Sequence, residues 1–320
     1  MGNNVLLSLC IPTCMRGDIL HRVLDHTLSL NEFDQHVQLV ISDNGSTDST
    51  EIVVKEAIKK YPKKNIKFHR NDTNLGVINI LTALQLGDGV YCKLLNDYVL
   101  IGNEALKKMK DTVASFVNCN TKDSCLLFID HLRHWNYQIH DGGNIVLHNI
   151  NEVVITLNNK MTWVSNTGCF REQIPELSQF NIYNDKLLPI LYWTLYLCKT
   201  RKNVFINDVS YFGSINVPSS KRILTYNFFT PHIVWYYEAI SHFTKLTKSH
   251  YRRDRYRLLS NFVGGSIIKF LIIREPCGYD LSGSWKLLFK YFYDIPYFYV
   301  VLTKGYCVLC KDRFRKLLKH

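Results

Sequence analysis

The first part of the chain alternates short apolar runs with segments whose apolar residues recur every three or four positions. The short runs predict buried strands, and the wider spacing predicts amphipathic helices. The predicted strands are Val5–Ile11, Val37–Ser42, Ile66–His69 and Val90–Leu95. The predicted helices are Ile19–Leu30, a segment capped by Ser46 and Thr47, Val77–Leu86 and Glu104–Phe116. This alternation predicts a parallel α/β sheet within residues 1–115.

The rest of the chain changes character near residue 220. Further apolar runs occur at Cys125–Asp130, Val153–Leu157, Trp163–Phe170 and Val204–Val209, with a helix expected over Lys186–Thr200. Beyond residue 220 the pattern is helical, with helices expected over His232–Thr247 and His250–Ile273. We therefore expect one domain over 1–220, with halves 1–115 and 116–220, and a helical region over 221–320.

Charge and aromatic content separate the same two parts. The 320 residues carry a net charge of +12, and residues 1–220 hold 21 basic and 21 acidic side chains. Residues 221–320 hold 18 basic and 6 acidic side chains and 22 of the 41 aromatic ones. Such a region suits an anionic membrane surface, or a small helical domain with an aromatic core and solvated cations. Its aromatic residues follow no recognised nucleic-acid module, so we expect no nucleic-acid partner.

Several features predict a cytoplasmic protein. The 10 cysteines are scattered without a visible disulfide framework, which favours free thiols in a reducing compartment. The apolar run at the N-terminus is short and lacks a preceding basic segment, unlike a signal peptide. No stretch of 18 apolar residues is present that could span a bilayer.

Polar residues follow each predicted strand of the first half. The four turns contain Pro12-Thr13-Cys14-Met15-Arg16, Ser42-Asp43-Asn44-Gly45-Ser46-Thr47-Asp48, Asn71-Asp72-Thr73-Asn74-Leu75-Gly76 and Asn96-Asp97-Tyr98. Ligands of open α/β sheets bind beyond the carboxyl ends of the strands. Asp43 can accept hydrogen bonds from a nucleobase or a ribose hydroxyl there, although Asp43-Asn44-Gly45 alone also fits a plain β-turn. The turns contain neither the dinucleotide fingerprint nor a Walker loop.

These turns resemble those of family 2 glycosyltransferases, which have the GT-A fold. Residues 12–16 are similar to the family's PTYNR turn, and residues 42–48 to its VDDGSTD turn. An N-x-G element follows at residues 74–76, and a G-x-Y-x-x-x-L-x-D segment at residues 89–97. Within the family, the chain most resembles abequosyltransferase-like enzymes of bacterial surface polysaccharides, whose turns read near SDNGSTD and LLGDDDLL. The resemblance is strong over residues 5–110 and looser over 120–215.

The resemblance implies a pocket for a nucleotide-sugar donor. Asp43 would face the base, with Asn74 and Gly76 on the ribose side and the diphosphate beside Asn96 and Asp97. The residues implied for this pocket are Pro12, Thr13, Arg16, Asp43, Asn74, Gly76, Asn96 and Asp97.

The segment Asn96-Asp97-Tyr98-Val99 departs from the family pattern. Family members usually offer two or three carboxylates here to hold Mg²⁺ or Mn²⁺, and Asp97 is the one acid in this segment. Mg²⁺ can bind through one carboxylate, phosphates and water, so this segment permits a divalent cation at Asp97 but does not require one. Lys221-Arg222 could instead stabilise the leaving group, or could simply begin a solvated helix.

The resemblance also implies an acceptor side and an inverting mechanism. Gly168 and Arg171 belong to a G-x-x-x-R-E-like strand at the family's acceptor cleft. The family's general base usually precedes the next helix, which indicates Asp185, with Asp208 and Asp130 in reserve. A helix N-cap is the alternative role for Asp185.

The implied enzyme transfers a sugar from a nucleoside-diphosphate sugar to a growing bacterial surface glycan, such as capsule, lipooligosaccharide or O-antigen. The acceptor would be a glycan or a lipid-linked glycan at the cytoplasmic face of the inner membrane. Residues 221–320 would contact the membrane, the acceptor or a second copy of the chain. The alternatives are a degenerate GT-A protein that binds nucleotide or glycan without turnover, and a nucleic-acid-binding protein.

Overall fold

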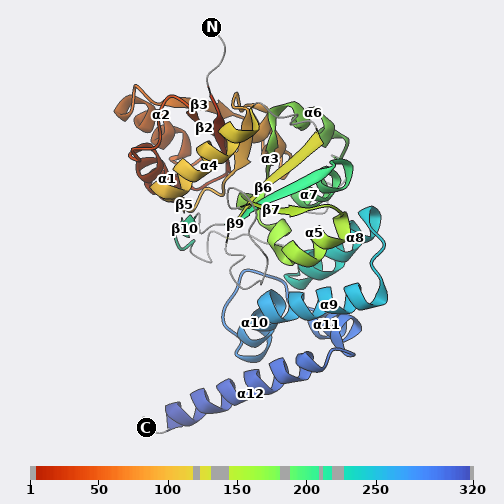
Figure 1. The fold of residues 1–320 in the computed structure, drawn as a ribbon. Helices are drawn as coiled ribbons and strands as arrows, with labels where there is room; N and C mark the ends of the chain where they lie inside the picture. The colour runs from red at the N-terminus through yellow and green to blue at the C-terminus, as the bar shows by residue number, and fades with distance from the viewer. Residues whose placement is uncertain are drawn as a thin grey trace. The chain divides into compact units, whose positions relative to one another are not determined.

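The computed structural model describes residues 5–117, 123–130, 144–180, 188–208, 212–217 and 227–317. Contacts divide the chain into two units (Figure 1). Unit 1 comprises Met1–Ile150 and Lys160–Val217, and unit 2 comprises Asn151–Asn159 and Pro218–His320.

The central sheet of unit 1 has the strand order β3-β2-β1-β4-β8. The first four strands pair in parallel, and β8 runs antiparallel to β4. The strands are β1 (Leu7–Thr13), β2 (Val37–Asp43), β3 (Asn65–Arg70), β4 (Tyr91–Leu94) and β8 (Gly168–Phe170). The expected parallel α/β sheet is confirmed, and parallel pairing brings the carboxyl ends of β1 to β4 to one edge.

Helices cover both faces of this sheet. Alternate residues of β1, Leu7, Leu9 and Ile11, pack into one buried cluster with apolar residues of α1, α2 and α4. The helix α3 contacts β1, β2 and β4, and its buried Leu81 and Leu84 lie outside that cluster. These helices are α1 (Gly17–Leu28), α2 (Thr50–Lys60), α3 (Ile78–Gln85) and α4 (Asn103–Phe116). Each lies where apolar periodicity predicts a helix.

A second sheet of unit 1 has the order β6-β9-β7, and β5 pairs with β10 in a separate ribbon. The hydroxyl of Tyr91 donates a 2.6 Å hydrogen bond to the carbonyl of Leu126, which joins the two main sheets. The strands are β5 (Val99–Ile101), β6 (Ser124–Ile129), β7 (Asn144–Leu147), β9 (Asn203–Asp208) and β10 (Phe212–Ser214). The short helix α6 (Ile174–Leu177) and the longer α7 (Pro189–Thr200) complete the unit.

Two apolar runs differ from simple strands. The run Val153–Leu157 lies in helix α5 (Ile150–Leu157), where its side chains are buried. In the run Trp163–Phe170, the three residues of β8 are extended, and residues 164–166 form a 3-10 turn.

Unit 2 is helical. Wide π-helical turns precede α8 and flank α10. The helices are α8 (Tyr236–Phe243), α9 (Lys248–Leu258), α10 (Gly264–Ser266), α11 (Ser284–Phe292) and α12 (Pro296–Leu317). No helix within the described part of the chain is long and apolar enough to cross a bilayer.

A buried carboxylate ties three elements of unit 2 together. Asp254 of α9 accepts hydrogen bonds from Asn158, at 2.6 Å, and from the hydroxyls of Tyr236 and Tyr237, at 3.2 and 3.0 Å. Burial raises the pKa of Asp254 to about 6. The three donors explain how the core of this unit holds an acidic side chain.

We predict that His232→Phe removes an acid-dependent loss of stability. The imidazole packs against the rings of Phe228 and Phe262, with centroid distances of 5.0 and 4.7 Å. Burial lowers the pKa of His232 from 6.5 to about 4. Because the unfolded chain is protonated first, the free energy of unfolding should fall by roughly 2–3 kcal/mol as the pH drops from about 6.5 towards 4. Urea unfolding across this range should show a shallower slope for the variant. Equal slopes would contradict the assignment.

Candidate functional site

Backbone hydrogen bonds hold the carboxyl ends of the four parallel strands together. The amide of Asn44 donates to the carbonyl of Thr13, and the amide of Asn71 donates to the carbonyl of Asp43, each at 2.9 Å. The amide of Leu95 donates to the carbonyl of Cys10, also at 2.9 Å. The polar turns that follow the strands therefore share one edge of the sheet.

The side chain of Asn44 fastens the turn after β3 to the end of β2. Its amide nitrogen donates to Asn74 Oδ1 at 2.7 Å and to the carbonyl of Gly76 at 3.1 Å. Its amide oxygen accepts from the backbone nitrogen of Leu75 at 2.8 Å. Gly76 has a φ of +58°, a left-handed conformation that glycine adopts without strain. Asn74 and Gly76 thus lie at the predicted edge in a well-defined turn.

Asp43 is fully buried at the end of β2. One carboxylate oxygen accepts from the backbone nitrogen and the hydroxyl of Ser46, at 3.2 and 2.5 Å. The other oxygen has no hydrogen-bond donor among the described residues and lies 3.5 Å from Nε of Arg70. This second oxygen remains an unused acceptor beside a cation.

The sequence reasoning did not identify Arg70. This residue ends β3, stands opposite Asp43 in the parallel register, and also donates to the carbonyl of Ser46 at 3.0 Å. Its position directly after the predicted strand Ile66–His69 is the signal that could have identified it. Arg70 supplies the positive charge that stabilises a buried carboxylate.

Asp97 joins the end of β4 to the end of β1. One oxygen accepts from Nη1 of Arg16 at 2.5 Å, and the other accepts from the hydroxyl of Thr13 at 2.9 Å. Burial raises the pKa of the Asp97 carboxyl, although the Arg16 charge and the Thr13 hydrogen bond oppose the shift. The guanidinium of Arg16 lies 6.0 Å from the Tyr98 ring centroid. About a quarter of the Arg16 side chain is exposed to solvent. Asp97 therefore orients a cation at the surface of this edge.

A buried lysine supports the same region from within, and the sequence reasoning did not identify it either. Nζ of Lys93 donates to the carbonyl oxygen of Ser165 and, at 3.4 Å, to those of Phe128 and Thr167. Burial lowers the pKa of Lys93. The hydroxyl of Ser165 in turn accepts from the backbone nitrogen of Asn96 at 2.8 Å. Lys93 thus fixes the segment that holds the Asn96–Asp97 turn.

The structure brings most of the predicted residues together, but not Arg171. The predicted donor-pocket residues all belong to the strand ends and turns of this edge. Gly168 pairs with Lys93 near the same end of β4, where a side chain would clash with the ring of Tyr91. Arg171 follows the residue paired with Tyr91, at the opposite end of β4, and its guanidinium lies 3.7 Å from Asp88. The antiparallel direction of β8 separates the two ends.

Of the residues predicted to take part in catalysis, the structure describes the side chain of Asp130 alone. Asp185, Lys221 and Arg222 lie outside the described residues. Asp208 ends β9, but its side chain is not described. Asp130 follows β6, is buried, and donates its backbone N–H to Asn166 Oδ1 at 3.1 Å.

The described residues do not fit a divalent-cation site. Their His, Cys, Asp and Glu side chains form no group of three or more that could hold a metal ion. Asp97 uses one oxygen for Arg16 and the other for Thr13. Divalent cations need several oxygen ligands, and the cation beside Asp97 is instead the Arg16 guanidinium.

Part of the chain is similar in sequence to known proteins. The description of the matching family is "Glycosyl transferase family 2", over residues 8–166. The chain is 30% identical to abequosyltransferase RfbV of Salmonella typhimurium over 124 residues, which is 38% of this chain and 37% of that protein. It is 33% identical over 113 residues to the uncharacterized glycosyltransferase MG025 of Mycoplasma genitalium, 34% of this chain and 37% of that one. The chain thus matches little more than a third of the length of these relatives.

Solved structures share the fold at low sequence identity. Residues 1–349 of S. aureus TarS in complex with UDP align with a TM-score of 0.53 at 15% identity, covering 82% of this chain and 75% of that one. The mannosyltransferase PcManGT of Pyrobaculum calidifontis, in complex with GDP-Man and Mn²⁺, aligns with a TM-score of 0.50 at 11% identity, covering 94% and 84%. Together with the family match and the parallel sheet, these findings show that residues 8–166 belong to glycosyl transferase family 2 and that the fold is GT-A.

Proposed function

We propose that this protein is an inverting glycosyltransferase that moves a sugar from a nucleoside-diphosphate sugar to a growing bacterial surface glycan. The observation that carries the proposal is the shared strand edge, where a buried acceptor beside Arg70 and the partly exposed Arg16 on Asp97 lie at neighbouring strand ends. The family and the named relatives support the same chemistry. The glycan would be a capsule, a lipooligosaccharide or an O-antigen.

Asp43 would recognise the base of the donor. Its second carboxylate oxygen is buried and lacks a hydrogen-bond donor among the described residues. An N–H of a nucleobase or a ribose hydroxyl would reach this covered oxygen once a neighbouring side chain moves aside, and would satisfy an acceptor that is costly to leave unpaired. The rigid turn around Asn44 would place Asn74 and Gly76 along the ribose.

Arg16 would bind the diphosphate. A guanidinium has five N–H donors in a planar fork that suits phosphate oxygens, and Asp97 engages one edge of it. The positive charge would stabilise the negative charge that grows as the nucleoside diphosphate leaves. Asp97 is then a positioning residue for Arg16, and Asn96 borders the same phosphates.

Asp185 would act as the general base. An inverting transfer needs a group that takes the proton of the acceptor hydroxyl as that oxygen attacks the anomeric carbon. Asp130 is the reserve that the structure describes, in the buried region behind the Asn96–Asp97 turn. Gly168 and Arg171 would border the acceptor side, with Gly168 near the donor turns and Arg171 at the opposite end of β4.

The second candidate function is binding of nucleotide or glycan by a degenerate GT-A protein without turnover. The engagement of Asp97 by Arg16 and Thr13 favours it, because that acid is then not free to bind a metal. Hydrolysis or transfer with any sugar nucleotide would decide for the enzyme.

We also propose that the protein works at the cytoplasmic face of the inner membrane on a lipid-linked acceptor. Residues 1–220 would be the catalytic domain, and residues 221–320 would contact the membrane. The excess of 18 basic over 6 acidic residues in 221–320 supports this division.

We predict that Arg70→Met weakens nucleotide binding about tenfold or more, because the carboxylate of Asp43 loses its cation. Asp43→Ala should have a similar effect. The matched control is Lys67→Met. Lys67 lies on the same strand, and its side chain is 39% exposed, close to the 37% of Arg70, but it pairs with Asp88 and not with Asp43. Calorimetry with the nucleotide that best stabilises the protein in a screen of UDP-, GDP-, CMP- and dTDP-sugars is the measurement. Equal affinities for both β3 variants would exclude Arg70 from the site.

We predict that Asp185→Asn leaves donor binding intact and lowers transfer roughly 100-fold or more, as expected for loss of a general base. Asp111→Asn, at a residue of α4 whose side chain is 63% exposed, is the control. Transfer and nucleotide affinity should be measured on the same preparations. Near-normal transfer by the Asp185 variant would leave this residue as a helix cap.

We predict poor affinity for Mn²⁺ in the absence of nucleotide. One engaged carboxylate supplies too few oxygen ligands, so the nucleotide phosphates must complete the shell or the metal is dispensable. Asp97→Ala should impair turnover more than donor binding, because the charge that Arg16 meets grows in the transition state. Calorimetry with Mn²⁺ alone and then with nucleotide is the measurement. Tight binding of Mn²⁺ to the free protein would show that other carboxylates complete a site.

A further inference from the structure

Among the residues that the structure describes, exposed aromatic side chains are confined to unit 2. Where side chains are described, all aromatic residues of unit 1 are at least partly covered, and its exposed large apolar residues are aliphatic or Met. In unit 2, six aromatic side chains are more than a third exposed. They are Tyr256, Trp285, Phe289, Tyr293, Tyr299 and Tyr306.

The helix α11 carries a buried row of side chains and, beside it, an exposed aromatic row that ends at the residue after the helix. Ser284, Leu288 and Phe292 form the buried row that packs into unit 2. Trp285, Phe289 and Tyr293 form a second row at the same spacing, and they are 37%, 43% and 62% exposed. The second row lies about 100° around the helix from the buried row, so the apolar stripe of α11 extends beyond the part that unit 2 covers. Large aromatic side chains left exposed in a row indicate a surface that is covered in use.

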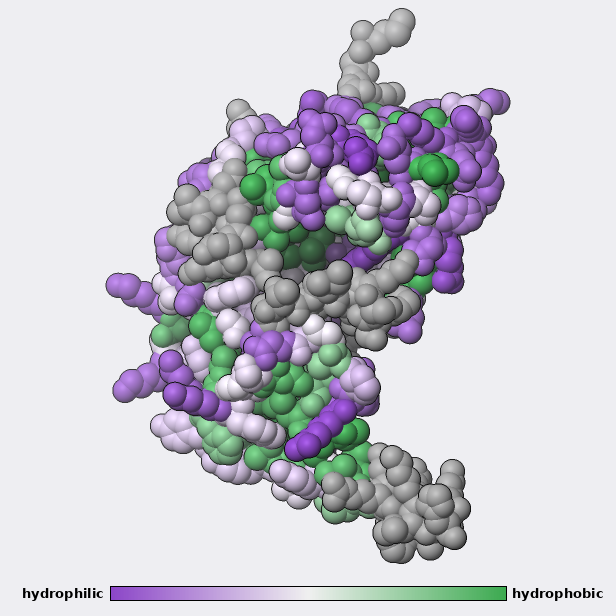
Figure 2. All heavy atoms as spheres, turned by 180° about the vertical axis from the view of Figure 1, so that it is seen from behind, coloured by the Kyte–Doolittle hydropathy of each residue, from purple (hydrophilic) through white to green (hydrophobic). Residues whose placement is uncertain are grey.

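The exposed row of α11 continues onto α12. The ring of Phe289 lies 5.2 Å from that of Phe298, which in turn contacts Tyr299 at 5.6 Å. The hydroxyl of Tyr299 donates to the carbonyl of Tyr293 at 2.9 Å. We call Trp285, Phe289, Tyr293, Tyr299 and Tyr306 the aromatic face. Figure 2 shows exposed apolar residues along the C-terminal helices, interspersed with hydrophilic ones.

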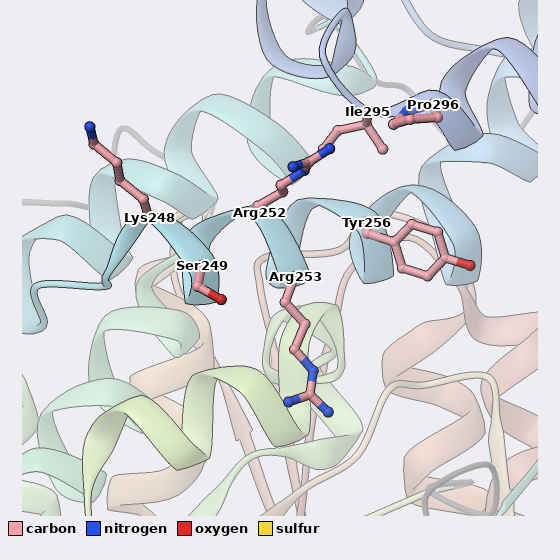
Figure 3. A pocket seen from close by; sticks show the side chains of 7 residues that line it. All are labelled: Lys248, Ser249, Arg252, Arg253, Tyr256, Ile295 and Pro296. Carbon is pink, nitrogen blue, oxygen red and sulfur yellow. The ribbon is translucent and has the colours of Figure 1, made fainter.

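Cations accompany the aromatic face. Lys286 and Lys290 are exposed on α11, each directly after an aromatic residue of the face, and Lys304 is exposed on α12. A pocket of about 580 Å³ adjoins the junction of α11 and α12 (Figure 3). It is lined by Lys248, Ser249, Arg252, Arg253, Tyr256, Ile295 and Pro296.

The pocket, which we call the basic pocket, combines charge with apolar surface. Figure 3 shows Lys248 and Arg252 on the side of α9 towards Ile295 and Pro296, and Arg253 on the other side. No ion pair joins Lys248 or Arg253 to another residue of the described segments. Cations beside an apolar wall suit a phosphate group attached to a hydrocarbon chain.

We propose that the aromatic face and the basic pocket dock unit 2 onto the surface of an anionic lipid bilayer. Trp and Tyr favour the membrane–water interface, where the ring is partly buried and its polar group stays hydrated. Lys286, Lys290 and Arg252 would meet the lipid phosphates, and α11 would lie in the plane of the interface.

A second copy of the chain fits this surface less well. Residues 221–320 hold 18 basic and 6 acidic side chains, so a symmetric dimer through the face would bring like charges together. An anionic bilayer supplies the opposite charge along with an apolar layer. The inference rests on the membrane part of the proposed function and not on sugar transfer, so the two can fail separately.

Vesicle binding by the full chain, without any sugar nucleotide, tests the inference. Binding to vesicles of phosphatidylglycerol and phosphatidylethanolamine at low salt should exceed binding to phosphatidylcholine vesicles at least tenfold. Lys286→Glu with Lys290→Glu should reduce binding roughly tenfold or more, since each basic residue near the surface contributes about 1 kcal/mol. Trp285→Ser with Phe289→Ser should reduce it similarly. The charge-matched control is Lys59→Glu with Lys63→Glu on exposed positions of unit 1, which should bind like the wild type.

A second measurement does not depend on disruptive variants. Brominated lipids should quench part of the wild-type tryptophan emission, and the mild substitution Trp285→Phe should remove that quenched part while vesicle binding persists. Absence of binding to anionic vesicles, or equal binding by the face variants and the control, would overturn the proposal. So would a concentration-dependent dimer, formed without lipid and lost in the same variants, because the face would then belong to a second copy.

Discussion

The buried carboxylate of Asp97 connects two strand ends that lie 81 residues apart in sequence. Its two oxygens receive Arg16 and Thr13, so the turn after β1 and the turn after β4 are held as one structure. This contact is available because β1 pairs in parallel with both β2 and β4, which places all the relevant turns at the same edge. The arrangement of the candidate site depends on that pairing and on the neutralisation of one buried charge.

The same contact changes how the proposed donor diphosphate would be bound. A family 2 enzyme with several acids at this position can hold a divalent cation, whereas here the acid holds a guanidinium. The turn that carries Arg16 includes Met15 with a φ of +54°, a conformation that costs energy for a residue with a side chain. The end of β2 has a similar pair, in which Arg70 compensates the negative charge of the fully buried Asp43 carboxylate. Each acid is therefore paired with an arginine that lies closer to solvent.

Local pattern predicts the elements of the first half, because strands such as β1 and helices such as α1 show their periods in the residues themselves. It does not predict β5 and β10, which are three residues each and exist through mutual pairing across more than a hundred residues. The run Val153–Leu157 is β-branched yet helical, since burial against the rest of its unit outweighs propensity. Motif position indicated Asp43 and Asp97, but Arg70 and Lys93 acquire their roles only from register and burial. The direction of β8, which takes Arg171 to the far end of β4, is likewise absent from local sequence.

The central claim is that the carboxyl edge of β1 to β4 binds a nucleoside diphosphate. Hydrogen–deuterium exchange of the full chain, with and without saturating UDP, GDP, CDP or dTDP, measures this directly because it reports each turn separately. The account predicts that at least one nucleotide slows exchange in residues 12–17, 43–48, 71–78 and 95–99 together, and leaves the amino end of β4 around Asp88 and Arg171 unchanged. Protection of the Asp88–Arg171 end alone, or no protection by any of the four nucleotides, would contradict it.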